Sequence, residues 1–135
     1  MLQKLGRLTK LNQDLNMQTV PSGQYVTDKF PVLTFGNPPD IDLNAWRFRL
    51  FGLVEKEVVL DWEQFVDLYQ MTVDSEFHCV TQWSRMENVW EGVAFNELMK
   101  LLKLMPEAEY VMVHCYGGYT TNLSLEVLQG DDVLF

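Results

Sequence analysis

Basic residues are scarce in this 135-residue chain, which has 10 lysines and arginines against 19 aspartates and glutamates and a formal net charge of −9. Proteins that bind nucleic acids hold the phosphate backbone mainly through lysine and arginine. The composition therefore argues against a nucleic-acid partner. An anionic ligand would need a local basic pocket on this acidic protein.

Long apolar runs are also missing, and cysteine is rare. No run approaches the ~18 apolar residues that a membrane-spanning helix needs, and no apolar signal segment leads the chain. Free thiols are typical of reducing compartments, so the two cysteines, Cys79 and Cys115, are predicted to be unpaired. We expect a cytoplasmic protein without a membrane span.

Apolar residues make up 47% of the chain, enough for one compact domain that buries roughly two thirds of its unfolded surface. Residues 1–29 begin with leucines at helix-compatible spacing among lysines and arginines and then turn polar. They are predicted to form a flexible leader, with a docked surface helix as the alternative. The globular composition begins at Phe30, so residues 30–135 are predicted to form the domain.

Within this domain, helix-like and strand-like patterns follow one another in irregular order. Helical spacing predicts one helix over residues 61–70, with Asp61 as N-cap and Gln64 completing a capping box, and a second over 95–102. Alternating patterns predict strands over residues 46–50, 58–60 and 71–80, and a further strand from 110 into a turn at 115–119. The chain lacks strict βαβ alternation, which favours an α+β fold with mixed sheets and short helices.

The segment 77–93 places Cys79 at the end of an apolar strand and before a polar, aromatic stretch that is predicted to be a loop over 81–92. A lone cysteine beside apolar residues is most often a small buried hydrophobe. A thiolate at the end of a strand is also a soft metal ligand on a rigid support. The residues alone leave both interpretations open.

This segment resembles the molybdenum-ligand loop of the sulfite oxidase family, in its bacterial branch of molybdopterin-dependent oxidoreductases, where Cys-Val-x-x-Trp-Ser is followed by Trp-x-Gly. The resemblance covers about residues 30–135 and implies the N-terminal portion of a sulfite-oxidase-like molybdopterin-binding domain. It implies that Cys79 is the one protein ligand to molybdenum, beside the pterin dithiolene and oxo groups. It further implies oxygen-atom transfer on a small substrate, with electrons leaving singly to a haem or quinone partner.

Arg85 is the only base in the loop that follows Cys79. An anionic substrate or a pterin phosphate would need such a donor, so Arg85 is a candidate anion-binding and catalytic residue. The alternative is a surface ion pair with Glu87 or Glu91. His78 precedes Cys79 and points to the other face of the strand, so we expect a hydrogen-bonded histidine there rather than a second metal ligand.

Two further candidates lie near residue 117. By the resemblance, Tyr119 corresponds to an active-site tyrosine of the animal and plant enzymes, with a simple turn tyrosine beside Gly117 and Gly118 as the alternative. Cys115 stands where the bacterial branch has a threonine that contacts the pterin, and is assigned to cofactor binding on that basis although its chemistry differs.

Residues 133–135 form an apolar, strand-like run with no turn or cap after it. Family members continue into basic segments that hold the pterin phosphate, so the domain is expected to be truncated at its C-terminus. We expect this chain alone to be inactive, to hold little or no cofactor, and to self-associate through an unpaired strand edge. The alternative from another functional class is a non-catalytic, cofactor-free fragment or protein-interaction module of the same fold.

Overall fold

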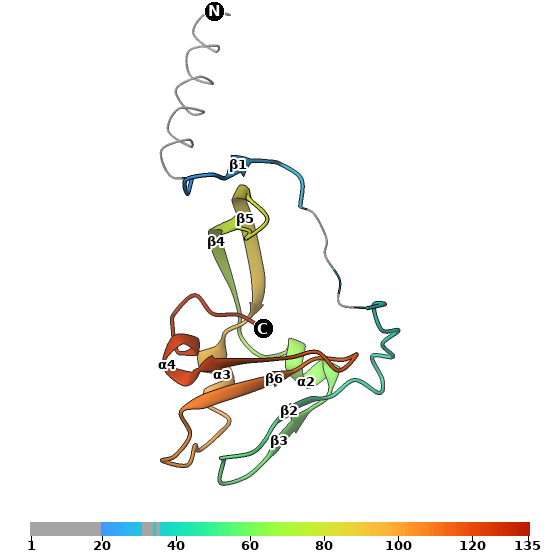
Figure 1. Cartoon of the computed structure of the whole chain (residues 1–135). Helices are drawn as coiled ribbons and strands as arrows, with labels where there is room; N and C mark the ends of the chain where they lie inside the picture. Colours follow the sequence, from blue (N-terminus) through green and yellow to red (C-terminus); the bar gives the residue numbers. More distant parts are fainter. Residues whose placement is uncertain (1–19, 31–33, 35) are drawn as a thin grey trace, which may run out of the picture. The chain divides into compact units, whose positions relative to one another are not determined.

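The computed structural model describes residues 20–30, 34 and 36–135 (Figure 1). Contacts divide these residues into two compact units. The first unit comprises the described residues up to Phe30 together with Asp74–Trp90, and the second comprises the described residues from 34 to 73 together with Glu91–Phe135. The leader predicted for residues 1–29 lies largely outside the described residues, and both it and the boundary at residue 30 stay predictions.

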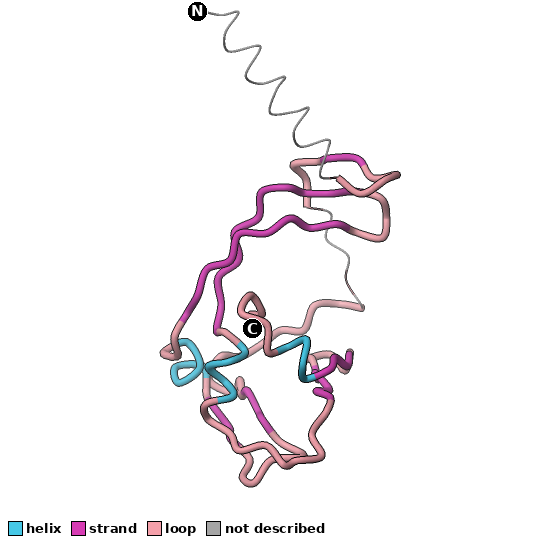
Figure 2. The backbone as a smooth tube through the Cα atoms, turned by 90° about the vertical axis from the view of Figure 1, so that its left-hand side faces the viewer, coloured by secondary structure: helices cyan, strands magenta, loops and turns pink. Residues whose placement is uncertain are grey.

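The first unit contains a three-stranded sheet in the order β1, β5, β4. Strand β1 (Tyr25–Val26) pairs in parallel with the start of β5 (Trp83–Val93), and β4 (Gln70–His78) lies on the other side of β5, as the paired strands in Figure 2 show. The backbone N–H groups of Tyr25 and Thr27 donate to the carbonyls of Gln82 and Ser84 at 3.0 and 2.9 Å. The segment around β1 is therefore tied to the strand that follows Cys79.

Strand β5 corrects the prediction of a loop over residues 81–92, which is wrong. Its buried positions include Ser84 and Asn88, polar residues that strand patterns do not reveal. The Asn88 amide donates to the carbonyls of Ser75 and Arg85, both at 3.0 Å, and the Trp90 indole N–H donates to the Ser75 hydroxyl at 2.9 Å. Hydrogen bonding to the neighbouring strand offsets the cost of burying these polar groups.

Two antiparallel pairs form the sheets of the second unit. Strands β2 (Phe48–Leu50) and β3 (Val58–Leu60) pair with Phe48 opposite Leu60, and β6 (Tyr110–His114) pairs with β7 (Thr120–Ser124) across a tight turn. The predicted strands at 58–60 and from 110 are confirmed, and the first pair begins slightly later than the predicted residue 46. Strand β7 was not predicted.

Three short helices complete this unit: α2 (Trp62–Val66), α3 (Phe95–Met99) and α4 (Leu125–Leu128). The capping box predicted for α2 is confirmed, because the Asp61 carboxylate accepts from the Gln64 N–H at 2.8 Å while the Gln64 side chain accepts from the Asp61 N–H at 3.0 Å. The helix ends well before residue 70, where β4 begins. None of the described helices is long and apolar enough to cross a membrane.

The core of the second unit consists of Phe65, Val93 and Leu98, contributed by α2, the end of β5 and α3. Partly buried apolar side chains pack around these three: Trp46, Phe48, Leu50, Leu60, Leu68, Met99 and Phe135. Small sheets and short helices thus share one apolar core. The predicted α+β fold class with mixed sheets is confirmed.

The last residues, 133–135, pair with residues 93–95. The N–H groups of Val93 and Phe135 donate to each other's carbonyls at 2.8 and 2.9 Å, and the Phe95 N–H donates to the Val133 carbonyl at 2.9 Å. The run is therefore paired along one side with residues 93–95, and self-association of the chain stays a prediction. The approach is so close that a Cβ added to Gly92 would lie 2.5 Å from the Phe135 carbonyl oxygen.

We therefore expect Gly92→Ala to destabilise the second unit by about 1 to 3 kcal/mol, because the new methyl group overlaps a backbone atom that cannot rotate away. Thermal denaturation followed by circular dichroism measures the change. Glu91→Ala, at the exposed neighbouring position, is the control. Its free energy of unfolding should lie within about 0.5 kcal/mol of that of the parent chain. Equal melting of the two variants would contradict the close approach of Gly92 to Phe135.

Candidate functional site

Cys79 follows β4 and opens the tight turn that leads into β5. Its N–H donates to the Trp83 carbonyl at 2.9 Å, and its carbonyl accepts from the Gln82 N–H at 3.0 Å. Gln82 has φ 70°, in the left-handed region that residues other than glycine rarely adopt. A short hairpin loop whose final residue is left-handed has this geometry. Both backbone polar groups of Cys79 are thus held by the turn.

The Cys79 thiol lies in a polar setting at the tip of this hairpin. The Thr81 hydroxyl donates to Sγ at 3.1 Å. This hydrogen bond, followed by one from the Thr81 backbone N–H, lowers the pKa of Cys79 below its usual value, against a smaller opposing effect of burial. Neighbouring Val80 is 95% exposed, so the tip faces solvent. The structure does not make Cys79 a fully buried hydrophobe.

The donor set at this tip suits a metal centre that takes a single ligand from the protein. Among the residues that the structure describes, no group of three or more histidines, cysteines, aspartates or glutamates could hold a metal ion. A thiolate is a soft ligand, and a lowered pKa increases the thiolate fraction. The Cys79 thiolate can thus act as a single soft ligand to a metal.

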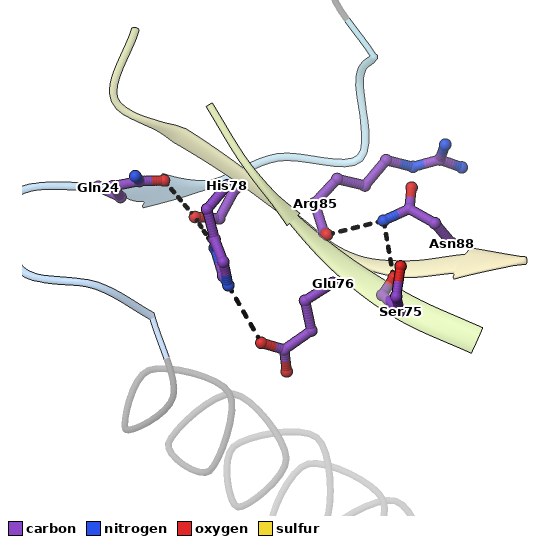
Figure 3. A network of polar contacts seen from close by, with 7 residues as sticks. Gln24, Ser75, Glu76, His78, Arg85 and Asn88 are labelled. Carbon is purple, nitrogen blue, oxygen red and sulfur yellow. Dashed lines mark hydrogen bonds and ion pairs between the residues drawn. The ribbon is translucent and has the colours of Figure 1, made fainter. Parts of the chain in front are cut away.

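His78 belongs to a separate hydrogen-bonded network, drawn in Figure 3. Its Nδ1 lies 2.8 Å from the Ser84 hydroxyl and its Nε2 lies 3.2 Å from the Glu76 carboxylate, while the Ser84 hydroxyl donates to the Gln24 side-chain oxygen at 2.5 Å. Both ring nitrogens have hydrogen-bond partners, so the prediction of a hydrogen-bonded histidine is confirmed. The network links the segment before β1 to β4 and β5, next to Cys79.

Arg85 lies on β5 beside a cluster of aromatic rings. Its guanidinium is 5.7 Å from the centroid of the Phe30 ring, and Phe30 in turn contacts Phe77, Trp83 and Trp90. Within the described part of the first unit the guanidinium forms no ion pair, so the alternative pairing with Glu87 is not formed. A guanidinium stacked on a ring keeps its hydrogen-bond donors for a ligand.

Cys115 and Tyr119 lie in the second unit, at the tip of the hairpin between β6 and β7. The Cys115 N–H donates to the Tyr119 carbonyl at 2.9 Å, and the Gly118 N–H donates to the Cys115 carbonyl at 3.1 Å. Gly117 and Gly118 have φ 90° and 88°, which a residue with a Cβ rarely adopts. The turn therefore brings Cys115 and Tyr119 together, whereas Cys79 and Arg85 belong to the other unit.

The second unit also contains a cavity of about 570 Å³ that sequence patterns did not identify. Cys115, Tyr116, Arg47 and Arg49 contribute to a lining that is otherwise largely apolar. The Arg47 backbone N–H donates to the Tyr116 hydroxyl at 3.0 Å, which joins the start of β2 to the β6–β7 turn. The alternation of arginines with apolar residues along 46–50 was the only sequence signal for this cavity.

Comparison with known proteins finds similarity over most of the chain. Residues 35–135 match the family described as the oxidoreductase molybdopterin binding domain. A curated relative, the uncharacterized oxidoreductase YuiH of Bacillus subtilis (strain 168), is 36% identical over 118 residues, which cover 87% of this chain and 60% of that protein. The chain thus spans about 60% of the length of this relative. No solved structure matches the chain significantly.

The hydrogen bond from Thr81 predicts a measurable change in cysteine reactivity. We expect Thr81→Val to raise the pKa of Cys79 toward its usual value, because the largest cause of its lowering is lost. In a Cys115→Ser background, the pH profile of iodoacetamide alkylation should shift to higher pH, with slower reaction near neutral pH.

Thr81→Ser is the matched control, since it keeps a hydroxyl donor at the same position and should retain the parent profile. If the valine and serine variants were alkylated with the same pH profile, the Thr81 hydroxyl would have no influence on the Cys79 thiolate.

Proposed function

Because the chain belongs to the oxidoreductase molybdopterin-binding domain family, the cofactor domain of the sulfite oxidase family, we propose that it forms part of a molybdenum-cofactor-dependent oxidoreductase in which Cys79 is the metal ligand. The proposed reaction is oxygen-atom transfer on a small substrate. The observation that carries the proposal is the position of Cys79 at a hairpin tip, with its thiol polarised by Thr81 and open to solvent.

The hairpin is the part of this chain that would hold the metal. When bound, the molybdenum cofactor supplies oxygen-atom transfer together with storage of two electrons. The turn constrains both backbone polar groups of Cys79, so the sulfur is presented in one place rather than on a mobile loop. The Thr81 hydroxyl favours the thiolate that a metal binds.

Arg85 is the proposed anchor for an anionic substrate. Its guanidinium lies over Phe30 without an ion pair in the described first unit, and a planar fork of donors suits an oxyanion. In a chain with a net charge of −9, a guanidinium without an ion pair attracts an anion locally.

Cys115 and Tyr119 have supporting roles in the proposal. Cys115 would contact the pterin, and Tyr119 would act as an active-site tyrosine. The hydrogen bond between their backbones holds both residues at one hairpin tip. Electrons would leave singly to a haem or quinone partner, and a cytoplasmic location remains part of the proposal.

The alternative function is a non-catalytic, cofactor-free interaction module of the same fold. The scarcity of lysine and arginine favours it, because a pterin phosphate needs several charge-assisted hydrogen bonds from basic groups. The proposed enzyme contains molybdenum and the interaction module does not, so the metal content of the protein distinguishes the two functions.

We expect the full-length parent protein, expressed in a host that makes molybdopterin, to contain about one molybdenum per chain, as the one-ligand site at Cys79 requires. Cys79→Ser should lose most of its activity, because a hydroxyl is a poor substitute for a thiolate. Elemental analysis and activity assays measure both effects, with Lys56→Ala, at an exposed position outside the proposed site, as the control that keeps its molybdenum.

The 135-residue chain alone is expected to hold little or no cofactor. A parent protein without molybdenum would support the cofactor-free module and rule out the proposed enzyme.

In the parent enzyme, Arg85→Ala should raise KM for an anionic substrate about ten- to a hundredfold, equivalent to ~1.4 to 3 kcal/mol, while kcat falls less. Loss of an exposed charge elsewhere costs under about 1 kcal/mol of stability and leaves the kinetics unchanged. Lys56→Ala, at an exposed position of the second unit, is the control for removal of one positive charge. An unchanged kcat/KM in Arg85→Ala would assign Arg85 to the surface rather than to the substrate.

A further inference from the structure

A pocket of about 490 Å³ lies entirely within the first unit and is lined by Phe30, Arg85, Glu87, Asn88, Val89 and Trp90. Its volume falls in the range of small-molecule sites. Arg85 is the only one of these residues to which the proposed function gives a role. The others carry a buried acceptor, a carboxylate and two aromatic rings, and these groups together restrict the chemistry of a ligand.

The buried acceptor is the side-chain oxygen of Asn88, a residue only 6% exposed. The Asn88 amide nitrogen donates to the carbonyls of Ser75 and Arg85, which identifies the other amide atom as the oxygen. Within the described part of the chain this oxygen is buried and has no hydrogen-bond partner. In Figure 3 it points toward the side chain of Arg85. Burial of an acceptor without a hydrogen bond costs free energy, so a ligand that brings a donor to this oxygen would bind favourably.

Two side chains of opposite charge, Arg85 and Glu87, line the same pocket as this acceptor. Arg85 and Glu87 are two residues apart on β5, and side chains at that spacing lie on the same face of a strand. Among the described residues neither the guanidinium nor the Glu87 carboxylate forms an ion pair. A ligand that places an anionic group at Arg85 can therefore place a cationic donor at Glu87.

Phe30, Val89 and Trp90 form the apolar part of the pocket lining. The rings of Phe30 and Trp90 lie 6.1 Å apart at 75°, and Val89 is 70% exposed beside them. Such an edge-to-face pair offers surfaces against which an apolar or aromatic group can pack. Since the Asn88 oxygen is closed to water, a donor reaches it only when a neighbouring side chain shifts, and Arg85 is the long side chain toward which this oxygen points.

We propose that this pocket binds a zwitterionic amino acid with an apolar or aromatic side chain. Arg85 binds the carboxylate, Glu87 and the Asn88 oxygen bind the ammonium group, and Phe30 and Trp90 contact the side chain. The inference rests on the role proposed for Arg85 and names the class of carboxylate-bearing ligand that this residue binds.

The test is isothermal titration calorimetry on the cofactor-free 135-residue chain with three probes. L-Phenylalanine carries both charged groups, 3-phenylpropionate lacks the ammonium, and phenethylamine lacks the carboxylate. We expect L-phenylalanine to bind at least tenfold more tightly than either of the others. Equal affinity for all three, or no binding of L-phenylalanine at millimolar concentration, would overturn the proposal.

Two variants at partly or fully exposed positions assign the charged groups. Arg85→Gln should weaken binding of L-phenylalanine and 3-phenylpropionate about tenfold and leave phenethylamine unchanged, and Glu87→Gln should weaken L-phenylalanine and phenethylamine and leave 3-phenylpropionate unchanged. Glu107→Gln, exposed and outside the pocket, removes the same charge as Glu87→Gln and should bind all three probes like the parent. If Glu107→Gln and Glu87→Gln had equal effects, net charge rather than the pocket would explain binding.

The calorimetry is independent of the metal. Failure of L-phenylalanine to bind would leave the molybdenum content of the parent protein and the Cys79→Ser result unaffected. Conversely, a parent protein without molybdenum would leave the selectivity among the three probes intact.

Discussion

The pairing of β4 with β5 positions the residues on which the proposed chemistry depends. Cys79 lies in the turn that joins these strands, and Arg85 lies on β5 itself. The turn engages both backbone polar groups of Cys79 and places Gln82 in a left-handed conformation. A non-glycine residue in this region stores conformational strain, which surrounding hydrogen bonds must offset. The strand pair thus converts a short turn into a defined position for one sulfur atom.

Buried polar side chains form hydrogen bonds between the elements of the first unit. Ser84 is fully buried and bonds His78 and Gln24, and Asn88 is buried and bonds the carbonyls of two residues. Buried hydrogen bonds are directional, so they specify strand register more closely than apolar contacts do. The Arg85 guanidinium instead lies over the Phe30 ring, which contacts the rings of Phe77, Trp83 and Trp90. Structural hydrogen bonds and the proposed ligand-binding cation are therefore carried by different side chains.

The second unit relies on apolar packing. Phe65, Val93 and Leu98 form its core, and the backbone pairing of residues 93–95 with 133–135 brings Phe135 against Gly92. This contact gives a physical reason for glycine in the Trp-x-Gly pattern, because no Cβ fits there. One glycine of the segment that identifies the family thus serves packing, while its cysteine serves the proposed chemistry.

Sequence patterns predicted the elements whose signals are local. The capping box of Asp61 and Gln64, the strand at 58–60 and the α+β class need only neighbouring residues to be recognised, and family membership followed from the motif around Cys79. The roles of Cys79, Arg85, Cys115 and Tyr119 stay predictions, although the structure gives each a defined setting. Strand β5 was missed because Ser84 and Asn88 make its buried positions polar, and their partners are distant in sequence.

The sequence by itself determined which chemical groups are present: one thiol after an apolar strand, one arginine beyond it, and an acidic chain around them. Only the tertiary structure decided which of these groups meet. It paired Val93 with Phe135, placed the Arg85 guanidinium over Phe30, and left the Asn88 oxygen without a partner among the described residues. Contacts between residues far apart along the chain depend on strand register and burial, and neither is encoded by any single local pattern.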